Sequence, residues 1–496
     1  MTASMQLTTD WLRTRASLTP VDMAVTCGGV NVTWSALHVR ADAVASALAS
    51  RGVREGDRVA LLLANGLPFT VLTHAVPRLG AILVPLNTRL SARELTWQLE
   101  DAGVCLLVHD GSTGSLAAEA AAALDVRLAD AAELREADAA CASEARDRLE
   151  RIHTIIYTSG TTGRPKGAML TFGNHLWSAI GSALNLGLRA DDQLLASLPM
   201  FHVGGLSVLV RSVIYGNPAI VQESFDPASV NAAIDGGATI VSAVANTLTR
   251  MLESRGDIGY PLTLRAILLG GGPAPRGLLE TCAVRGVPVV QTYGLTEAAS
   301  QVATLAPAET LRKLGSTGRP LFLTEIKIDG AAVPGDVGEI LVRGASVSPG
   351  YWRRPDETSE TFRDGWLRTG DIGHLDGEGY LYVLDRRDDL IVSGGENVYP
   401  AEVEAVLLSH PEVIGAGVYG IDDTRWGRVP LADVVLRPGT ALTVDSLKSY
   451  CRGRLANYKV PVHIRSVRAL PRTATGKLQR RLLGAPADML PQHRGP

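Results

Sequence analysis

Paired cysteines, a surplus of one charge and long apolar runs are all missing from this chain of 496 residues. Its cysteines are odd in number and form no Cys-x-x-Cys pair, which argues against a disulfide framework or a zinc site and favours a reducing, cytoplasmic setting. The 48 basic and 51 acidic residues nearly balance, so the charge gives no indication of a nucleic-acid partner. No apolar run is long enough to span a bilayer, and the first residues lack a signal-peptide pattern. The five cysteines are Cys27, Cys105, Cys141, Cys282 and Cys451.

Helix-like and strand-like segments alternate through most of the chain, and this alternation predicts βαβ units with mainly parallel sheets. Residues 117–148 are rich in alanine and predict an exposed helix, with disorder as the alternative. In the first third, helices are expected at 34–51 and 69–79, and strands at 58–63 and 81–85. Later strands are expected at 194–198, 218–222, 239–242, 265–269 and 287–290.

The length predicts more than one domain, because a single core rarely serves so many residues. From residue 315 to 384, short strands punctuated by Gly and Pro predict a small β subdomain. The expected α/β fold is therefore a large N-terminal domain with this subdomain, followed by a small C-terminal α/β domain. The predicted boundaries are 1–384 for the large domain, 385–389 for the linker, 390–483 for the small domain and 484–496 for an unstructured tail.

The stretch from Thr158 to Gly167 follows an apolar strand and predicts a cradle for a polyphosphate. Glycines let backbone N–H groups approach an anion, hydroxyls add donors, and a lysine adds positive charge. The order differs from a Walker A loop, which closes with Gly-Lys-Ser/Thr. The alternative is an ordinary surface turn. The residues assigned to nucleotide binding here are Thr158, Ser159, Gly160, Thr161, Thr162, Gly163 and Lys166.

Three further segments carry candidate site residues. A glycine-rich loop after a strand allows a flat ring to lie against bare backbone, although it could also be a sharp strand-to-helix turn. A second segment offers an aromatic face, hydroxyls and a carboxylate suited to a hard divalent cation. Asp371, after a Thr-Gly turn, could accept from ribose hydroxyls or form an Asx turn. The residues of the first two segments are Gly270, Gly271, Gly272 and Pro273, then Gln291, Thr292, Tyr293, Gly294, Thr296 and Glu297.

Together with Lys477 on a polar loop near the end, these motifs occur in one fixed order. In that order they resemble the adenylate-forming superfamily of acyl-CoA synthetases, luciferase-like enzymes and peptide-synthetase adenylation domains. The resemblance covers residues 10–483. It implies ATP, CoA and Mg²⁺ as cofactors, with the loop at 158–167 on the pyrophosphate portion of ATP.

The resemblance also implies individual roles. Gly270–Pro273 and Tyr293 would hold adenine, and Asp371 would bind the ribose with Arg386 beside it. Thr296 and Glu297 would meet the α-phosphate and Mg²⁺. Lys477 would bridge the attacking carboxylate and the α-phosphate.

In the superfamily the small domain rotates between two half-reactions, which implies a mobile C-terminal domain with a hinge at Asp388. A charged segment beside glycines could absorb such a backbone change, whereas the alternative is a static linker. The resemblance places the route of the CoA thiol at Gly394, Gly395 and Glu396.

The acid pocket is expected around His202, which is also a catalytic candidate, with Arg211 and, more weakly, Ser242. Arg211 is isolated in an apolar run, and a buried guanidinium needs an anion. That anion could be an acidic side chain such as Glu223 or Asp226, or a second carboxylate on the substrate.

The segments around His202–Arg211, 270–275, 315–320 and 384–402 are similar to the o-succinylbenzoate–CoA ligase branch of the superfamily. That branch works in menaquinone biosynthesis and activates the aliphatic carboxylate of an aromatic dicarboxylate. The alternatives are a synthetase for another acid, such as a fatty acid, malonate or benzoate, and an adenylation module that loads a carrier protein. The expected partners are small molecules, with no nucleic acid and no integral membrane segment, and a homo-oligomer is left open.

Overall fold

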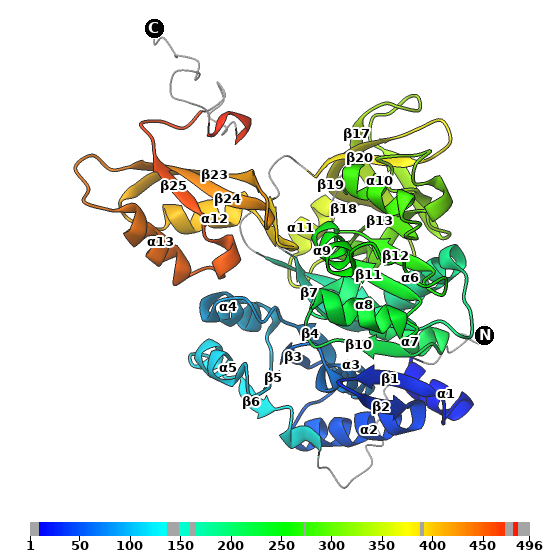
Figure 1. Ribbon diagram of the computed structural model, residues 1–496. Coiled ribbons are helices and arrows are strands. Elements are labelled where there is room, and N and C mark those ends of the chain that lie inside the picture. Colours follow the sequence, from blue (N-terminus) through cyan, green and yellow to red (C-terminus); the bar gives the residue numbers. More distant parts are fainter. Residues whose placement is uncertain are drawn as a thin grey trace. The chain divides into compact units, whose positions relative to one another are not determined.

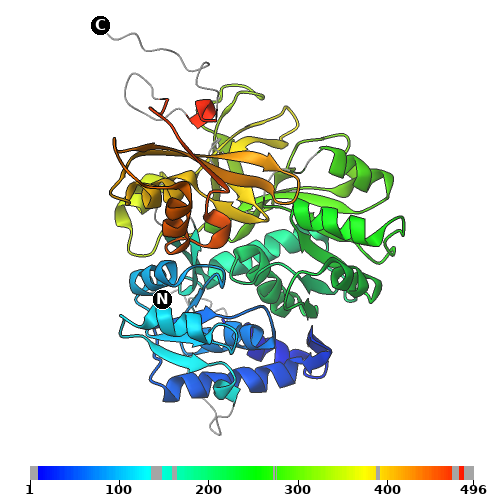
Figure 2. The same ribbon diagram turned by 60° about the vertical axis from the view of Figure 1, so that its left-hand side comes forward.

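The computed structural model describes residues 9–135, 148–158, 165–271, 274, 276–386, 391–471 and 480–484 (Figure 1). The chain divides into two compact units. The first comprises residues 1–88, 96–157 and 167–384, and the second comprises 89–95, 158–166 and 385–496. The predicted hinge residue Asp388 and most of the predicted tail lie outside the described residues. Figure 2 shows the chain from a second direction.

A six-stranded sheet near the N-terminus has the order β6-β5-β3-β4-β7-β8. β3 pairs in parallel with β4 and β5, β4 with β7, and β5 with β6. Its strands are β3 (Arg58–Leu62), β4 (Ile82–Pro85), β5 (Leu106–His109), β6 (Arg127–Asp130), β7 (Ile152–Thr158) and β8 (Lys166–Thr171). The helices of this region are α1 (Trp11–Leu18), α2 (Trp34–Ser50), α3 (Leu67–Arg78), α4 (Ala92–Ala102), α5 (Gly114–Ala121) and η1 (Glu133–Arg135).

The helices and strands predicted between residues 34 and 85 are confirmed. The helix predicted over 117–148 is confirmed for residues 117–121, which belong to α5, and is wrong for residues 127–130. α5 ends at Ala121, and residues 127–130 form β6 at the edge of the sheet. Backbone pairing with β5 outweighs the local helix preference of alanine, since β propensity depends mainly on neighbours.

A nine-stranded sheet forms the centre of the first unit, with the order β15-β14-β13-β12-β11-β9-β10-β1-β2. The strands from β13 to β1 run parallel, and antiparallel strands close both edges. Its strands are β1 (Met23–Cys27), β2 (Val30–Thr33), β9 (Leu194–Ala196), β10 (Ala219–Val221), β11 (Ile240–Ala243), β12 (Ala266–Leu269), β13 (Val289–Leu295), β14 (Ser300–Leu305) and β15 (Arg319–Pro320). The helices of this region are α6 (Phe172–Leu186), α7 (Val203–Tyr215), α8 (Pro227–Asp235), α9 (Ala245–Arg255), α10 (Arg276–Val284), η2 (Thr296–Ala298) and η3 (Pro307–Glu309).

The five strands predicted between residues 194 and 290 are confirmed as β9 to β13. They are short, apolar and almost fully buried, as parallel strands covered on both faces require. Because they run parallel, their carboxyl ends meet at one edge of the sheet, which is where open α/β sheets bind ligands.

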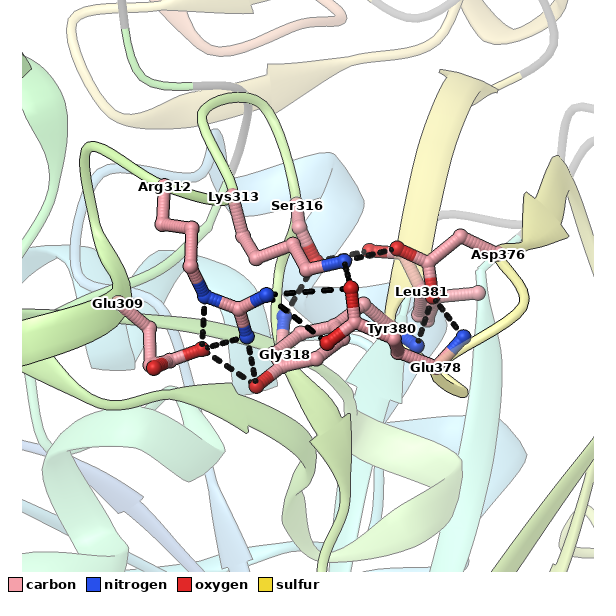
Figure 3. Close-up of polar contacts among 9 residues, drawn as sticks. All are labelled: Glu309, Arg312, Lys313, Ser316, Gly318, Asp376, Glu378, Tyr380 and Leu381. Carbon is pink, nitrogen blue, oxygen red and sulfur yellow. Dashed lines mark hydrogen bonds and ion pairs between the residues drawn. The ribbon is translucent and has the colours of Figure 1, made fainter.

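The predicted β subdomain is confirmed as a five-stranded sheet in which β17 pairs antiparallel with β16 and β19, and β18 pairs antiparallel with β19. Its elements are β16 (Thr324–Ile328), β17 (Gly338–Gly344), α11 (Pro355–Thr361), β18 (Phe362–Arg363), β19 (Trp366–Leu375) and β20 (Leu381–Arg386). A polar cluster joins the turn between β19 and β20 to the segment before β15 (Figure 3). In it, Lys313 Nζ lies 2.6 Å from Asp376 Oδ2 and 2.5 Å from Glu378 Oε1. The Ser316 hydroxyl donates to the Leu381 carbonyl at 2.8 Å.

The described C-terminal residues form a second five-stranded sheet with two helices, in agreement with the predicted small α/β domain. β23 and β24 make its longest antiparallel pair, and β25 runs parallel to β24. Its elements are β21 (Ile391–Ser393), β22 (Glu396–Val398), α12 (Pro400–Leu408), β23 (Val413–Asp423), β24 (Gly427–Leu436), α13 (Val444–Arg452), η4 (Asn457–Lys459), β25 (His463–Ser466) and η5 (Arg480–Leu482). In the part of the chain that the structure describes, no helix has the length and apolar content needed to cross a membrane.

Two buried histidines contact each other between the six-stranded sheet and α6. The rings of His153 and His175 lie 4.8 Å apart, and each side chain is about 3% exposed. His175 Nε2 is 2.9 Å from the Thr154 hydroxyl. Burial, and then the charge of Arg211, lower the pKa of His175 to about 3. Burial and the neighbouring His175 likewise hold the pKa of His153 well below its usual range.

These histidines predict acid sensitivity that begins near neutral pH. Their folded pKa values lie below the unfolded value of about 6.5, so the unfolded chain binds more protons as the pH falls. Stability should be fully present above about pH 6.5 and fall below it, by up to about 1.4 kcal/mol per pH unit for each histidine. The measurement is the urea midpoint of the first unfolding transition between pH 7.5 and 5.5.

His175→Gln should flatten this dependence, whereas His463→Gln, at an exposed position on β25, should leave it unchanged. An equal pH dependence in the wild type and in His175→Gln would contradict the assignment.

Candidate active site

The candidate nucleotide residues of the first unit gather at the carboxyl edge of the nine-stranded sheet. Gly270 directly follows β12, Tyr293 lies near the end of β13, and Thr296 begins η2 beyond it. Ser242 lies near the end of the neighbouring strand β11, paired with Leu268 of β12. The parallel register therefore brings together segments that are some 50 residues apart in the sequence.

The backbone around Gly270 and Gly271 requires glycine for two separate reasons. A Cβ at Gly270 would lie 3.0 Å from Thr292 Cγ2 on the neighbouring strand. Gly271 has a φ of +78°, a left-handed conformation that disfavours other residues. Gly272 and Pro273 lie outside the described residues. A bare backbone at this position is compatible with the close approach of a flat ring.

Two neighbouring residues of β13 have different hydrogen-bonding states. The Thr292 hydroxyl donates to the Ala303 carbonyl of β14 at 3.1 Å. Gln291 is 6% exposed, and its Nε2 has no hydrogen-bond partner among the described residues. A buried amide without a partner is costly, so Gln291 is a candidate for a ligand contact.

Tyr293 and Asp371, predicted from motifs almost 80 residues apart, contact each other directly. The Tyr293 hydroxyl donates to Asp371 Oδ2 at 2.6 Å, and the two residues are 9% and 2% exposed. The turn before Asp371 is held in place, because Glu339 Oε1 accepts from the Gly370 N–H at 3.0 Å. The Thr369 hydroxyl accepts from the Asp371 N–H at 3.1 Å. These contacts fix the direction of a buried carboxylate.

Glu297, the predicted Mg²⁺ residue, follows Thr296 in η2. Its Oε1 accepts from the Tyr351 hydroxyl at 2.8 Å. Among the described residues, no group of three or more His, Cys, Asp or Glu side chains is placed to hold a metal ion. Mg²⁺ is usually held by one or two carboxylates together with substrate phosphates, so a single carboxylate here fits that ion.

Both ends of the predicted phosphate loop lie in neighbouring strands. Thr158 ends β7, Lys166 begins β8, and the Thr158 hydroxyl lies 3.5 Å from the Lys166 carbonyl oxygen. The loop itself, including Ser159, Gly160, Thr161, Thr162 and Gly163, lies outside the described residues.

Arg211 is buried in α7 and is only 6% exposed. Burial lowers its pKa, an effect that the nearby Tyr215 opposes. Among the described residues no acidic side chain forms an ion pair with it, and its Nη2 has no hydrogen-bond partner. The two acids suggested by the sequence do not supply the anion. Glu223 is exposed, and Asp226 instead caps α8 by accepting from the Ser229 N–H at 2.8 Å.

His202 occupies the N-cap position of α7, the helix that carries Arg211. The first turn of α7 packs closely against the segment before His202, because a Cβ at Gly205 would lie 2.2 Å from the Pro199 carbonyl oxygen. The Ser242 backbone carbonyl lies 3.5 Å from the Ser197 hydroxyl. α7 follows β9, which lies beside β11, so His202 and Ser242 belong to neighbouring strand ends.

In the second unit, Gly394 and Gly395 form the turn between β21 and β22 with φ values of +59° and +87°. The Gly394 N–H donates to the Trp426 carbonyl at 2.8 Å, and a Cβ on Gly394 would lie 2.7 Å from the Trp426 ring. Glu396 is 4% exposed. Arg386 is the last residue of β20, and Lys477 lies outside the described residues.

Sequence reasoning did not find Tyr351 or Ser348, which both contact Glu297. The Ser348 N–H donates to the Glu297 carbonyl at 2.7 Å, and the Tyr351 hydroxyl donates to its carboxylate. In the sequence, the Pro349-Gly350 pair before Tyr351 indicates a constrained turn, but it does not show which residue the tyrosine contacts.

Comparison with known proteins gives matches along nearly the whole chain. Residues 12–352 match the family model described as AMP-binding enzyme, and residues 402–477 match the AMP-binding enzyme C-terminal domain. The chain is 52% identical over 479 residues to the 2-succinylbenzoate–CoA ligase of Geobacillus kaustophilus (strain HTA426), covering 96% of this chain and 97% of the relative.

Solved structures of o-succinylbenzoate CoA synthetase from Bacillus subtilis are also similar. A double mutant bound to the product analogue OSB-NCoA is 46% identical, with a TM-score of 0.91 and coverage of 96% and 97% of the two chains. The complex with the acyl-adenylate intermediate OSB-AMP is 45% identical, with a TM-score of 0.75 and coverage of 96% and 98%. The complex with ATP and magnesium ion is 45% identical, with a TM-score of 0.75 and coverage of 96% and 99%.

The contact between Tyr293 and Asp371 predicts a specific loss in Tyr293→Phe. The variant keeps the aromatic face for stacking and removes only the hydroxyl that holds the carboxylate. A hydrogen bond to a charged group contributes about 1.5–3 kcal/mol, so AMP should bind roughly 10–100 times more weakly in calorimetric titration. Tyr215→Phe removes a half-buried hydroxyl, which donates to the Ala179 carbonyl at 2.6 Å, and should leave AMP affinity unchanged. Equal affinities in the wild type and in Tyr293→Phe would show that this contact does not orient the nucleotide.

Proposed function

The chain belongs to the family of AMP-binding enzymes, and from that premise we propose that it ligates 2-succinylbenzoate to coenzyme A at the expense of ATP. The products are 2-succinylbenzoyl-CoA, AMP and pyrophosphate. The proposal is supported by relatives of that activity at about 50% identity over nearly the whole chain. The structural observation that carries it is the buried guanidinium of Arg211, which has no acidic partner among the described residues.

The first half-reaction joins the aliphatic carboxylate of the acid to the α-phosphorus of ATP. A carboxylate oxygen attacks phosphorus, the bond to the bridging oxygen breaks, and pyrophosphate leaves with the electron pair. Both reactants are anions, so their repulsion has to be reduced. We assign this to Lys477, with Thr296 beside the α-phosphate and Lys166 near the leaving phosphates. Bound Mg²⁺, which Glu297 would hold, supplies further neutralisation of phosphate charge.

The nucleotide has to be held while this attack occurs. We assign Asp371 to the ribose hydroxyls, because its buried carboxylate is fixed by Tyr293 and by the turn before it. The bare backbone at Gly270 and Gly271 and the ring of Tyr293 are assigned to adenine. Orienting the two reactants in this way removes much of the entropic cost of the encounter.

The second half-reaction exchanges AMP for the thiol of CoA. The sulfur attacks the acyl carbon, the bond to the phosphate oxygen breaks, and AMP leaves, while the thiol proton passes to solvent. We assign the turn at Gly394 and Gly395 to the thiol route on the basis of the family resemblance. Rotation of the small domain about Asp388 between the two steps remains a proposal from the family resemblance.

The acid is selected by charge and shape. After the aliphatic carboxylate has reacted, the benzoate carboxylate of 2-succinylbenzoate remains ionised and requires a cation. Arg211 can supply two parallel N–H donors to it, which is the geometry that a guanidinium offers to a carboxylate. His202 and Ser242, at neighbouring strand ends, are assigned to the same pocket. Because the proposed substrates ATP and CoA belong to the cell interior, we also propose a cytoplasmic location.

The proposal is tested by incubating the protein with ATP, Mg²⁺, CoA and single acids and following AMP release. The panel consists of 2-succinylbenzoate, benzoate, malonate and a medium-chain fatty acid. 2-Succinylbenzoate should give the highest kcat/KM by at least about tenfold, because only it supplies both the activated carboxylate and the ring carboxylate for Arg211. A higher kcat/KM for a monocarboxylic acid would overturn the assignment of the substrate while leaving the acyl-adenylate chemistry intact.

A second prediction concerns Arg211 itself. Arg211→Ala would leave the ring carboxylate buried without a partner, which costs about 2–5 kcal/mol in kcat/KM. Arg211→Lys should also be impaired, since an ammonium group cannot replace a planar pair of donors. The comparison uses 2-succinylbenzoate and an analogue that lacks the ring carboxylate, and ATP affinity should hardly change.

Arg265 provides a matched control, because it is a half-buried arginine with a structural partner. Its Nη2 lies 2.6 Å from Asp192 Oδ2. Arg265→Ala should affect both acids by the same factor, whereas Arg211→Ala should affect mainly the dicarboxylate. If Arg211→Ala also loses the same factor on both acids, Arg211 is a structural residue and does not bind the substrate.

A further inference from the structure

Residues 345–352, between β17 and α11, form an irregular segment that contacts two of the predicted motifs. We call residues 345–352 the strap. None of its residues was assigned a role from the sequence. The strap lies against β8, which begins at the end of the phosphate loop, and against η2, which carries Glu297.

Backbone hydrogen bonds attach the strap to β8. The Trp352 N–H donates to the Gly167 carbonyl at 2.8 Å, and the Met169 N–H donates to the Gly350 carbonyl at 3.0 Å. The Ser348 hydroxyl donates to the Met169 carbonyl at 2.6 Å. Gly167 and Met169, two positions apart at the start of β8, therefore both form backbone hydrogen bonds with the strap.

The same strap holds Glu297 at two points. The Ser348 N–H donates to the Glu297 backbone carbonyl at 2.7 Å. The Tyr351 hydroxyl donates to Glu297 Oε1 at 2.8 Å. One contact fixes the main chain and the other fixes one oxygen of the carboxylate, so the other carboxylate oxygen has a defined direction.

Tyr351 is itself held rigidly. It is 7% exposed, and its ring meets that of Phe362 edge to face with 5.6 Å between the centroids. The Tyr351 N–H donates to the Thr358 hydroxyl at 3.0 Å. Gly350 before it has a φ of +142°, and a Cβ there would lie 2.3 Å from Thr358 Cγ2, so only glycine fits. On the other side of the strap, Asn174 Nδ2 donates to the Val347 carbonyl at 2.8 Å.

We propose that Tyr351 is a positioning residue that aims the Glu297 carboxylate at the divalent cation of the adenylation step. The inference rests on the proposed function, because it assigns a residue that acts on the same site. A flexible glutamate would lose rotamer freedom each time it bound a cation, whereas a carboxylate already held by a rigid phenol has lost that freedom on folding. Hydrogen bonds of this kind to metal-binding carboxylates typically account for a factor of about 10–100 in metal affinity or activity.

The test is Tyr351→Phe, which removes one hydroxyl and keeps the ring. The apparent Mg²⁺ activation constant of acyl-adenylate formation should rise roughly 10–100-fold. Thioester formation from preformed acyl-adenylate should keep its rate, because that step does not involve the cation. Mn²⁺ titration by electron paramagnetic resonance, with the enzyme and unreactive α,β-methylene-ATP, should show a similar loss of Mn²⁺ affinity without any turnover.

Tyr380→Phe is the matched control. The Tyr380 hydroxyl also donates to a carboxylate, Glu309 Oε2 at 2.5 Å, within the polar cluster of Figure 3. This change should leave the Mg²⁺ constant and the Mn²⁺ affinity as in the wild type. A thermal melt checks that each variant is folded. If Tyr351→Phe does not fold, Phe362→Leu loosens the packing of the same ring and should weaken Mn²⁺ binding in the same direction.

The outcomes separate this inference from the proposed function. A wild-type protein that forms no adenylate with any acid would contradict the proposed function. An active wild type together with unchanged Mn²⁺ affinity in folded Tyr351→Phe would overturn the role of Tyr351 alone. Equal losses in both half-reactions would show that Tyr351 supports the fold in general and does not orient Glu297.

Discussion

The hydrogen bond from Tyr293 to Asp371 joins the two sheets on which the candidate nucleotide-binding residues lie. Tyr293 belongs to β13 of the nine-stranded sheet, and Asp371 belongs to β19 of the five-stranded sheet. Asp371 is almost fully buried, and a buried carboxylate is costly unless donors surround it. The phenol donates to the carboxylate at 2.6 Å, and the turn at Thr369 and Gly370 fixes the backbone from which the carboxylate projects. The position of the carboxylate that we assign to the ribose is thus fixed before any nucleotide binds, which lowers the entropic cost of binding.

On the acid side, one charge is left without a protein partner among the described residues. Arg211 lies in α7 close enough to His175 of α6 to contribute to the low pKa of that histidine. His175 is therefore neutral. Among the described residues no acidic side chain forms an ion pair with the guanidinium, and we propose that an anionic group of the substrate does so. A monocarboxylic acid would leave this cation unpaired once its only carboxylate had become an acyl phosphate. The preference for a dicarboxylic over a monocarboxylic acid should therefore be large, because the monocarboxylic acid leaves a buried charged group without a partner.

The sequence was sufficient to predict the fold class and most strands, because short apolar segments separated by helices can bury their apolar side chains in few other arrangements. It was insufficient where pairing between distant segments decides the structure. β6 forms because its backbone pairs with that of β5, although the sequence of residues 117–148 locally favours a helix. The contact of Tyr351 with Glu297 links residues 54 positions apart, and no local sequence pattern predicts it. Arg211 could be recognised as an unusual charge, but whether Glu223 or Asp226 neutralised it depended on the direction of side chains in the folded chain.

We propose that this chain holds the acyl-adenylate of an aromatic dicarboxylate between Asp371 and Arg211. The most direct measurement is a crystal structure with an unreactive sulfamoyl analogue of 2-succinylbenzoyl-adenylate. We expect the ribose hydroxyls to contact Asp371 and the ring carboxylate to lie within hydrogen-bond distance of the Arg211 guanidinium, about 2.7–2.9 Å for a charged pair. A complex in which the ring carboxylate faces solvent or another cation, while Arg211 pairs with a side chain of the protein, would contradict it.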